Sequence, residues 1–132
     1  MISTRGRYGL RVMIDLAKQD GTGYIPLKEI AERQGISKKY LEIIVKELVA
    51  SKMIIGASGK GGGYKLSRKP GEYTVGEIIE RMEGSLATVA CLKAGAEPCP
   101  REANCDTLPM WKEYNDLVHD FFYGKNLTDL LQ

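Results

Sequence analysis

Residues 26–66 read PLKEIAERQGISKKYLEIIVKELVASKMIIGASGKGGGYKL and carry the clearest pattern in this chain of 132 residues. Apolar residues recur at helical spacing, first at Leu27, Ile30 and Ala31 and then at Leu41, Ile44, Val45 and Leu48. Gly35 stands where a left-handed residue ends a helix, and Ser37 offers an oxygen that caps the next one. Two helices joined by so short a turn predict a helix-turn-helix, whose second helix enters a DNA major groove.

A β-hairpin is predicted directly after these helices. Residues 53–55 and 64–66 are short runs with strand propensity, and the segment between them, GASGKGGG, is rich in glycine. Glycine lets the backbone turn tightly and approach a ligand closely. We expect this hairpin to be a wing that touches DNA through Lys60, Gly61 and Gly62.

The second helix of the motif presents a charged outer face. Residues 37–43 are expected to lie nearest the bases, and Lys38 and Lys39 are expected to hold phosphates, which sets affinity more than sequence choice. Residues 1–70 contain 14 Lys and Arg against 6 Asp and Glu, whereas residues 71–132 contain 5 against 11. A basic half that coincides with the motif favours double-stranded DNA as the partner over a charged surface with none.

Other classes of protein fit the sequence less well. The glycine-rich tip lacks the G-x-x-x-x-G-K-[ST] pattern of a phosphate-binding loop, and the chain has one histidine and no clustered acid–base set. We therefore expect neither an enzyme nor a small-molecule substrate. The sequence contains no run of about 20 apolar residues, so no membrane span is predicted. The first residues lack the apolar run of a signal peptide, so a cytoplasmic location is expected.

The helix-turn-helix is flanked by two further predicted helices. The first covers residues 4–18, and its Arg5, Arg7 and Arg11 either touch the DNA backbone or stay in solvent. A second begins at a capping box of Thr74 and Glu77 and ends near Gly84. The sequence thus predicts a mainly α fold, with a winged helix-turn-helix domain over residues 1–84.

All three cysteines fall in residues 85–108, which show no helical or strand periodicity. Cys91, Cys99 and Cys105 have the spacing C-x7-C-x5-C and suit an iron–sulfur cluster, with zinc or redox-active or inert thiols as alternatives. A [2Fe–2S] cluster takes two protein ligands per iron, so one position stays open. Asp106, His119, a residue of a partner subunit or a small exogenous ligand are the candidates for it.

Residues 109–132 are expected to form a dimerisation helix and a short tail. Pro109 suits the first turn of a helix, which then runs to Tyr123. A coiled-coil seam with the spacing 3, 4, 3 is formed by Trp111, Tyr114, Val118 and Phe121. Pairing with a second copy would place two reading helices about 34 Å apart. The alternative is a helix packed within its own monomer.

The chain resembles the Rrf2 family of bacterial winged-helix transcription regulators, and within it the IscR-like branch. The resemblance covers nearly the whole sequence and rests on the following motifs: STRGRYGLRVMIDLA, IPLKEIAERQGISKKYLEIIVKEL, GKGGGYKL, YTVGEIIE and the three cysteines before LPMW. It implies a homodimer that binds promoter DNA under the control of a [2Fe–2S] cluster on Cys91, Cys99 and Cys105. It also implies DNA contacts from Ser37, Tyr40 and Glu42.

The resemblance leaves the fourth cluster ligand unassigned. In IscR-like proteins a histidine three residues after the last cysteine completes the site, and the matching residue here is Leu108. In NsrR-like members an aspartate near the start of the first helix completes the cluster from the partner subunit, and the matching residue here is Arg7. Other members of the family work without a cluster, so the alternative is a regulator that senses thiol redox state or a partner protein.

Overall fold

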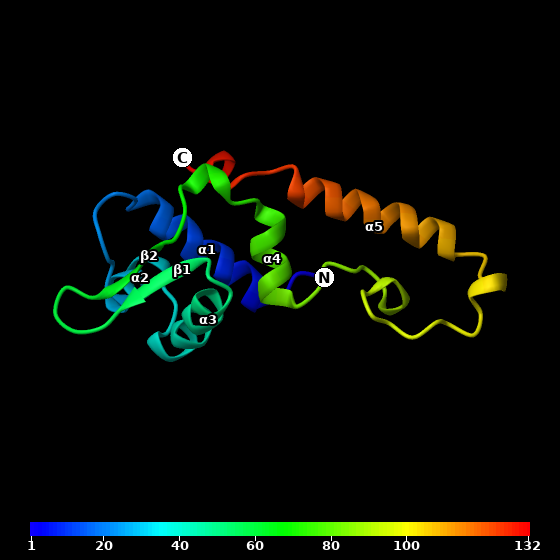
Figure 1. Cartoon of the computed structure of the whole chain (residues 1–132), viewed down its shortest axis with the longest axis horizontal. Helices are drawn as coiled ribbons and strands as arrows, with labels where there is room; N and C mark the ends of the chain where they lie inside the picture. Colours follow the sequence, from blue (N-terminus) through cyan, green and yellow to red (C-terminus); the bar gives the residue numbers. More distant parts are fainter.

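Five helices and one antiparallel hairpin make up the chain, as seen in a computed structural model that describes residues 1–132 (Figure 1). The helices are α1 (Thr4–Lys18), α2 (Leu27–Gln34), α3 (Lys38–Ala50), α4 (Val75–Glu83) and α5 (Leu108–Tyr123). The strands are β1 (Ile54–Ala57) and β2 (Gly63–Leu66). Short 3-10 turns lie at Pro70–Glu72, Ala90–Leu92, Glu102–Asn104 and Leu127–Leu130. The predicted mainly α winged-helix fold is confirmed.

The helix ends form as the sequence predicts. Gly35 ends α2 in the left-handed region with φ 63°, where a side chain would be strained. The Ser37 hydroxyl accepts a hydrogen bond from the Tyr40 amide at 3.2 Å and caps α3. Thr74 and Glu77 form the capping box of α4, with bonds of 3.1 and 3.4 Å. These local contacts fix where the helix-turn-helix and α4 begin.

The core is built around α1, which α2, α3 and α4 cover. Eighteen buried residues form it, including Val12 and Met13 of α1, Ile30 of α2 and Leu41 of α3. The helices α1 and α4 approach closely because Gly9 has no side chain, and a Cβ there would lie 2.5 Å from Met82 Cγ. The glycines of the TRGRYG motif thus bring the two helices together.

The hairpin is slightly longer than predicted. Ile54 pairs with Leu66 and Ala57 with Gly63, so β1 continues two residues past the expected run and β2 begins one residue earlier. An isolated bridge between Ile25 and Tyr64 adds the segment before α2 to the outer side of β2. Ile54 and Leu66 are buried and fasten the hairpin to the core.

An arm leaves the core after α4, runs through residues 85–107 and returns along α5 (Figure 1). Its return is fixed by two backbone hydrogen bonds: the Val75 amide donates to the Lys125 carbonyl at 2.8 Å, and the Leu127 amide donates to the Tyr73 carbonyl at 3.0 Å. Leu127 is fully buried in the core. Both ends of the arm are therefore anchored beside α4.

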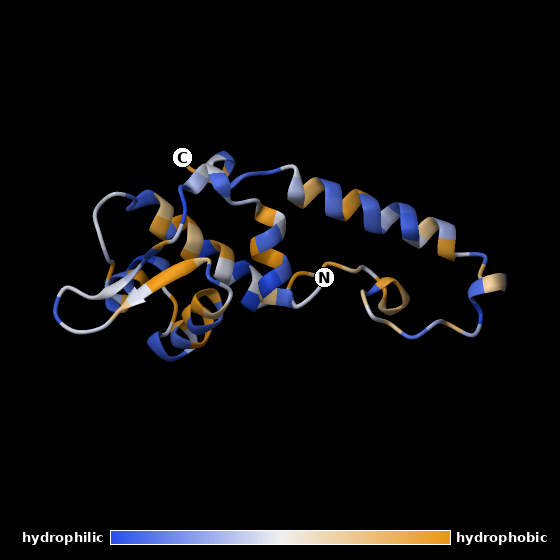
Figure 2. Ribbon diagram, in the orientation of Figure 1, coloured by the Kyte–Doolittle hydropathy of each residue, from blue (hydrophilic) through white to orange (hydrophobic).

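Apolar and polar residues alternate along α5 (Figure 2), and none of its residues is buried. The face turned toward residues 85–88 includes Val118 and Phe122, which line a hollow there, and Asn115, whose side-chain oxygen accepts from the Thr88 amide at 2.9 Å. The exposed apolar row is Met110, Tyr114, Leu117 and Phe121. Of the predicted seam, Tyr114 and Phe121 belong to this exposed row, whereas Trp111 and Val118 are half-buried in the monomer. The seam itself stays a prediction. No helix has the length and apolar character needed to cross a bilayer.

Candidate nucleic-acid interface and cysteine loop

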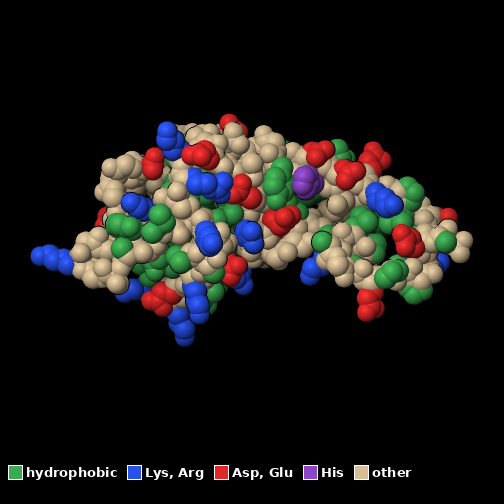
Figure 3. Space-filling view, in the orientation of Figure 1, with side chains coloured by type: hydrophobic (Ala, Val, Ile, Leu, Met, Phe, Trp, Pro, Cys, Tyr) green, Lys and Arg blue, Asp and Glu red, His purple; other side chains and the backbone are tan.

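The outer face of α3 is the first candidate surface. Leu41, Ile44, Val45 and Leu48 point into the core, and the opposite face exposes five side chains: Lys38, Lys39, Glu42, Ile43 and Lys46. The space-filling view shows Lys and Arg side chains over this winged-helix half and Asp and Glu side chains along the arm (Figure 3). A basic helix face of this kind suits a polyanion.

Ile43 lies in the middle of that face with 51% of its surface exposed. Helical spacing places it beside Lys39 and Lys46, directly opposite the buried stripe. Sequence reasoning placed Ile43 near the bases but assigned it no contact. An exposed aliphatic residue among lysines suits the methyl group of thymine better than it suits water.

Tyr40 has a packing role that the sequence pattern did not indicate. Its ring meets the ring of Tyr8 edge to face, with centroids 5.6 Å apart, and the guanidinium of Arg11 lies over the Tyr8 ring at 5.1 Å. Tyr40 is half-buried as a result. The first turn of α3 is therefore supported by α1.

The three arginines of α1 differ in their surroundings. Arg11 donates from Nε to the Gln34 side chain at 3.1 Å and also bonds the Gln34 carbonyl, which ties it to the end of α2. Arg5 pairs with Glu47 of α3 at 3.5 Å. Arg7 is exposed and contacts Thr4 of its own turn at 3.3 Å. Of the three, Arg7 is the most available to an outside anion.

The wing forms a second candidate surface beside α3. Lys60 is exposed at its tip. Gly61 has φ 78°, and a Cβ on Gly62 would lie 2.3 Å from the Ala57 carbonyl oxygen, so the tip itself requires both glycines. A groove of about 600 Å³ separates α3 from the wing, with Glu42 and Lys46 on one wall and Gly59 and Gly62 on the other. The second half of α3 and the inner side of the wing therefore face one space, and Lys60 lies outside it at the tip.

The cysteine loop brings the three thiols together around one hollow of about 260 Å³. Cys91, Cys99 and Cys105 all line it, and all are free thiols. Other lining residues include Glu97, Glu102, Leu108 and Lys112. No three His, Cys, Asp or Glu side chains converge closely enough to form a preassembled metal site. The donor type and the shared hollow fit a soft metal group, which Cys91, Cys99 and Cys105 would hold.

The candidates for the fourth ligand are separated by this arrangement. Leu108, three residues after Cys105, lines the hollow but has no donor atom. His119 lies elsewhere, stacked on Tyr123 with ring centroids 4.4 Å apart, and Asp106 is not among the lining residues. Glu97 and Glu102 supply the carboxylates at the hollow. The sequence pattern alone did not single out either of them.

The thiol of Cys105 lies in an environment that favours its thiolate form. A hydrogen bond between its Sγ and the Thr107 hydroxyl, at 3.5 Å, lowers the pKa of the thiol, and the Thr107 and Leu108 amides add to the effect. Arg101 contributes a favourable charge. Because the thiolate is the form that binds metals and reacts with oxidants, this environment favours both.

A basic reading helix, a wing and a compact helical core define a winged-helix DNA-binding transcription regulator. Residues 2–132 match the model of the Rrf2 family, described as an iron-dependent transcriptional regulator, and the chain belongs to that family. The HTH-type transcriptional regulator IscR of Aliivibrio salmonicida is 34% identical over 130 residues, which cover 98% of this chain and 76% of the relative.

Solved structures show the same likeness. The global cysteine regulator CymR of B. subtilis has a TM-score of 0.79 and 37% identity, covering 98% of this chain and 95% of that one. IscR of T. potens has a TM-score of 0.77 and 31% identity, covering 98% and 85%. The protein is a DNA-binding transcriptional regulator of the IscR/CymR type and not an enzyme.

Proposed function

We propose that this regulator is a homodimer that binds promoter DNA under the control of an iron–sulfur cluster held by Cys91, Cys99 and Cys105. The observation that carries the proposal is the shared hollow: three thiols from separate turns of the loop line one cavity beside the start of α5. The family likeness favours a [2Fe–2S] cluster. A bacterial cytoplasmic location follows from promoter binding and from the reduced thiols.

DNA contacts are assigned to the two surfaces that face the groove. Ser37, Lys38, Lys39, Tyr40 and Glu42 at the start of α3 enter the major groove, where Glu42 accepts a hydrogen bond from a cytosine amino group. Lys60, with the backbone of Gly61 and Gly62, holds a phosphate beside the minor groove. Support comes from the exposure of these lysines and from the groove of about 600 Å³ between α3 and the wing.

The second copy of the chain is assigned to the exposed row on α5. Met110, Tyr114, Leu117 and Phe121 follow the spacing 4, 3, 4 and form an apolar stripe in which each residue is at least half exposed in the monomer. Isologous pairing along this stripe would cover it on both copies and set the separation of the two reading helices.

When bound, the cluster supplies a redox-active iron centre that responds to iron supply and oxidants. The chain's own contribution is to transmit a restraint from the loop to α5. The thiols lie in three segments of the loop, so a shared ligand restrains those segments relative to one another and to the first turn of α5. Because α5 carries the proposed dimer stripe, restraining its start biases the arrangement of the two reading helices.

Iron and sulfide analysis after anaerobic reconstitution tests the cluster, with visible absorbance as the optical readout. The wild type is expected to take up iron and acid-labile sulfide, and Cys91→Ala to lose most of both. Lys93→Ala, a change in the same loop that removes no donor, is the matched control. A colourless wild type that takes up no iron would contradict the proposal.

A second candidate is a cluster-free regulator that senses thiol oxidation or a partner protein. The lowered pKa of the Cys105 thiol and the exposure of Cys91 and Cys99 favour it. One related structure is described as the oxidized form of CymR from Staphylococcus aureus. Mass spectrometry of the cysteine loop after peroxide treatment, together with iron analysis, separates the two candidates.

A further inference from the structure

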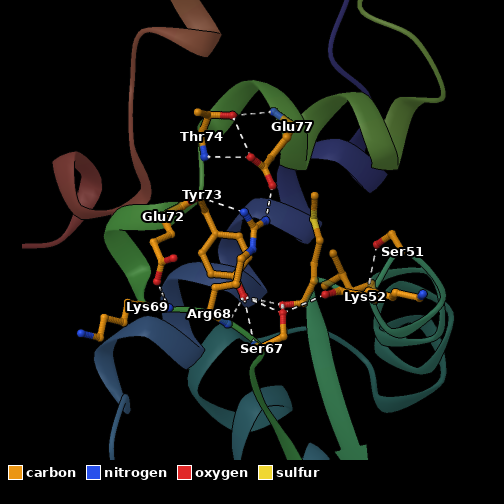
Figure 4. A network of polar contacts seen from close by, with 11 residues as sticks. Ser51, Lys52, Ser67, Arg68, Lys69, Glu72, Tyr73, Thr74 and Glu77 are labelled. Carbon is orange, nitrogen blue, oxygen red and sulfur yellow. Dashed lines mark hydrogen bonds and ion pairs between the residues drawn. The ribbon is translucent and has the colours of Figure 1, made fainter.

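Tyr73 is fully buried between the base of the wing and α4 (Figure 4). Its hydroxyl donates to the Met53 carbonyl at 2.6 Å and accepts from the amides of Ser67 and Arg68, both at 3.0 Å. Met53 comes directly before β1, and Ser67 and Arg68 directly after β2. One phenol therefore bonds to both legs of the hairpin at its open end, opposite the glycine tip.

Neighbouring side chains reinforce this connection. The Ser67 hydroxyl donates to the Lys52 carbonyl at 2.7 Å, where the backbone takes the left-handed conformation with φ 63°. The Arg68 guanidinium lies over the Tyr73 ring at 4.2 Å and pairs with Glu77, the capping residue of α4. The turn from α3 into β1, the end of β2 and the start of α4 thus meet around one ring (Figure 4).

Tyr73 can restrain the wing because its own backbone is fixed by hydrogen bonds to neighbouring segments. Its carbonyl accepts from the Leu127 amide at 3.0 Å, and its own amide donates to the Pro70 carbonyl at 3.3 Å. The neighbouring Val75 amide is bonded to Lys125, just after α5. The backbone of Tyr73 is therefore fixed to the C-terminal segment, and its side chain is fixed to the wing.

We infer that Tyr73 is a positioning residue for DNA binding: it sets the angle of the wing so that Lys60 reaches its phosphate while α3 occupies the major groove. The inference rests on the proposed contact of Lys60. Without the hydroxyl, the part-buried Arg68 amide loses its acceptor, and the two legs of the hairpin stay joined at this end only through Ser67, whose amide donates to the Met53 carbonyl at 3.4 Å. The legs can then shift relative to one another. The core contacts of α3 do not involve this hydroxyl, so the reading helix stays in place.

The test uses the full-length protein and a 30-base-pair duplex selected from a random pool by the wild type. The affinity of each variant is measured across a series of salt concentrations. Tyr73→Phe is expected to reduce the salt slope by about 1.8, as for one lost phosphate contact in each subunit of the dimer, and to weaken binding about sixtyfold at 0.1 M salt. Lys60→Ala is expected to do the same. The double variant is expected to bind no more weakly than either single variant, because both remove the same contact.

Tyr123→Phe is the matched control, since its hydroxyl bonds Glu80 of α4 at 3.1 Å and makes no contact with the wing. It is expected to leave the salt slope unchanged. The inference is overturned if Tyr73→Phe is less stable yet keeps the wild-type salt slope. It is also overturned if the loss of affinity in the double variant is the sum of the losses caused by Tyr73→Phe and by Lys60→Ala. If Tyr73→Phe does not fold, Ser67→Ala weakens the same base and takes its place in the cycle. If Lys60→Ala leaves both the affinity and the salt slope unchanged, the proposed contact between Lys60 and a phosphate is refuted instead.

Discussion

The carboxylate of Asp15 accepts two hydrogen bonds from the guanidinium of Arg33, at 2.8 and 3.0 Å, although Asp15 is only 3% exposed. The side-chain amide of Gln34 donates a third, at 2.9 Å. Asp15 lies on α1, and Arg33 and Gln34 form the last turn of α2. The pair therefore holds the first helix of the helix-turn-helix at a fixed position on the core. The hydrogen bonds to Asp15 raise the pKa of Arg33 above its usual value.

Asp15→Ala is expected to lower the free energy of unfolding by about 2 kcal/mol, because Gln34 loses a buried acceptor while half-exposed Arg33 recovers water. Urea denaturation followed by circular dichroism measures the change. Glu29→Ala removes the exposed partner of the same arginine and should cost less than about 0.5 kcal/mol. If both changes lower the free energy of unfolding by the same amount, the buried hydrogen bonds of Asp15 contribute no more to stability than the exposed ion pair of Glu29.

Cys105 provides a prediction for the cluster-free protein. Its lowered pKa means that alkylation by iodoacetamide should reach half its maximal rate at a lower pH than for an ordinary thiol. Thr107→Val removes the hydroxyl that bonds Sγ, so the thiolate loses stabilisation and the midpoint should move to higher pH. Peptide mapping of the alkylated loop between pH 6 and pH 10 gives the midpoint. An unchanged midpoint in Thr107→Val would assign the activation to another group.

The exposed row on α5 predicts the behaviour of the chain in solution. Leu117→Lys places a charge in the middle of the stripe and should convert a micromolar solution from dimer to monomer, as measured by sedimentation velocity. Asp116→Lys changes a charge on the same helix away from the stripe and should leave the dimer intact. A wild type that sediments as a monomer would remove the stripe as a dimer contact.

Ile43 is expected to read thymine in the selected duplex. Replacing the selected thymines by deoxyuridine removes only the 5-methyl groups and should weaken wild-type binding about fourfold per methyl contacted, from about 0.8 kcal/mol. Ile43→Ala should bind both duplexes equally well. Lys46→Ala, one turn away, should still discriminate between them. If Ile43→Ala keeps the full preference for thymine, another residue makes the contact.

Local features were predicted well because their causes are local. The first helix at Thr4–Lys18, the Ser37 cap and the capping box at Thr74 were all readable from spacing and residue type. Tyr73 was not identified, since its partners at Met53 and Ser67 are joined to it only by the fold. Helical spacing alone fits several apolar rows along α5, and the contact with residues 85–88 that half-buries Val118 arises only from the fold.

The cysteine loop, too, was predicted from the sequence only in part. Spacing indicated that the three cysteines belong together, whereas the approach of Glu97 and Glu102 to the thiols depends on the turns between them. The Glu102 amide bonds the Cys99 carbonyl at 3.0 Å, and the Cys105 amide bonds the Glu102 carbonyl at 3.5 Å. A periodic pattern does not encode such short-range turns, so the sequence predicted no regular structure in this loop.

Fluorescence-anisotropy titration of one selected duplex with cluster-loaded and cluster-free protein, under anaerobic conditions, tests the central claim most directly. Control of DNA binding by the cysteine loop predicts dissociation constants that differ by at least about fivefold, and a difference that vanishes in Cys91→Ala. Equal dissociation constants for the two forms, with iron bound in one and absent from the other, would contradict the claim.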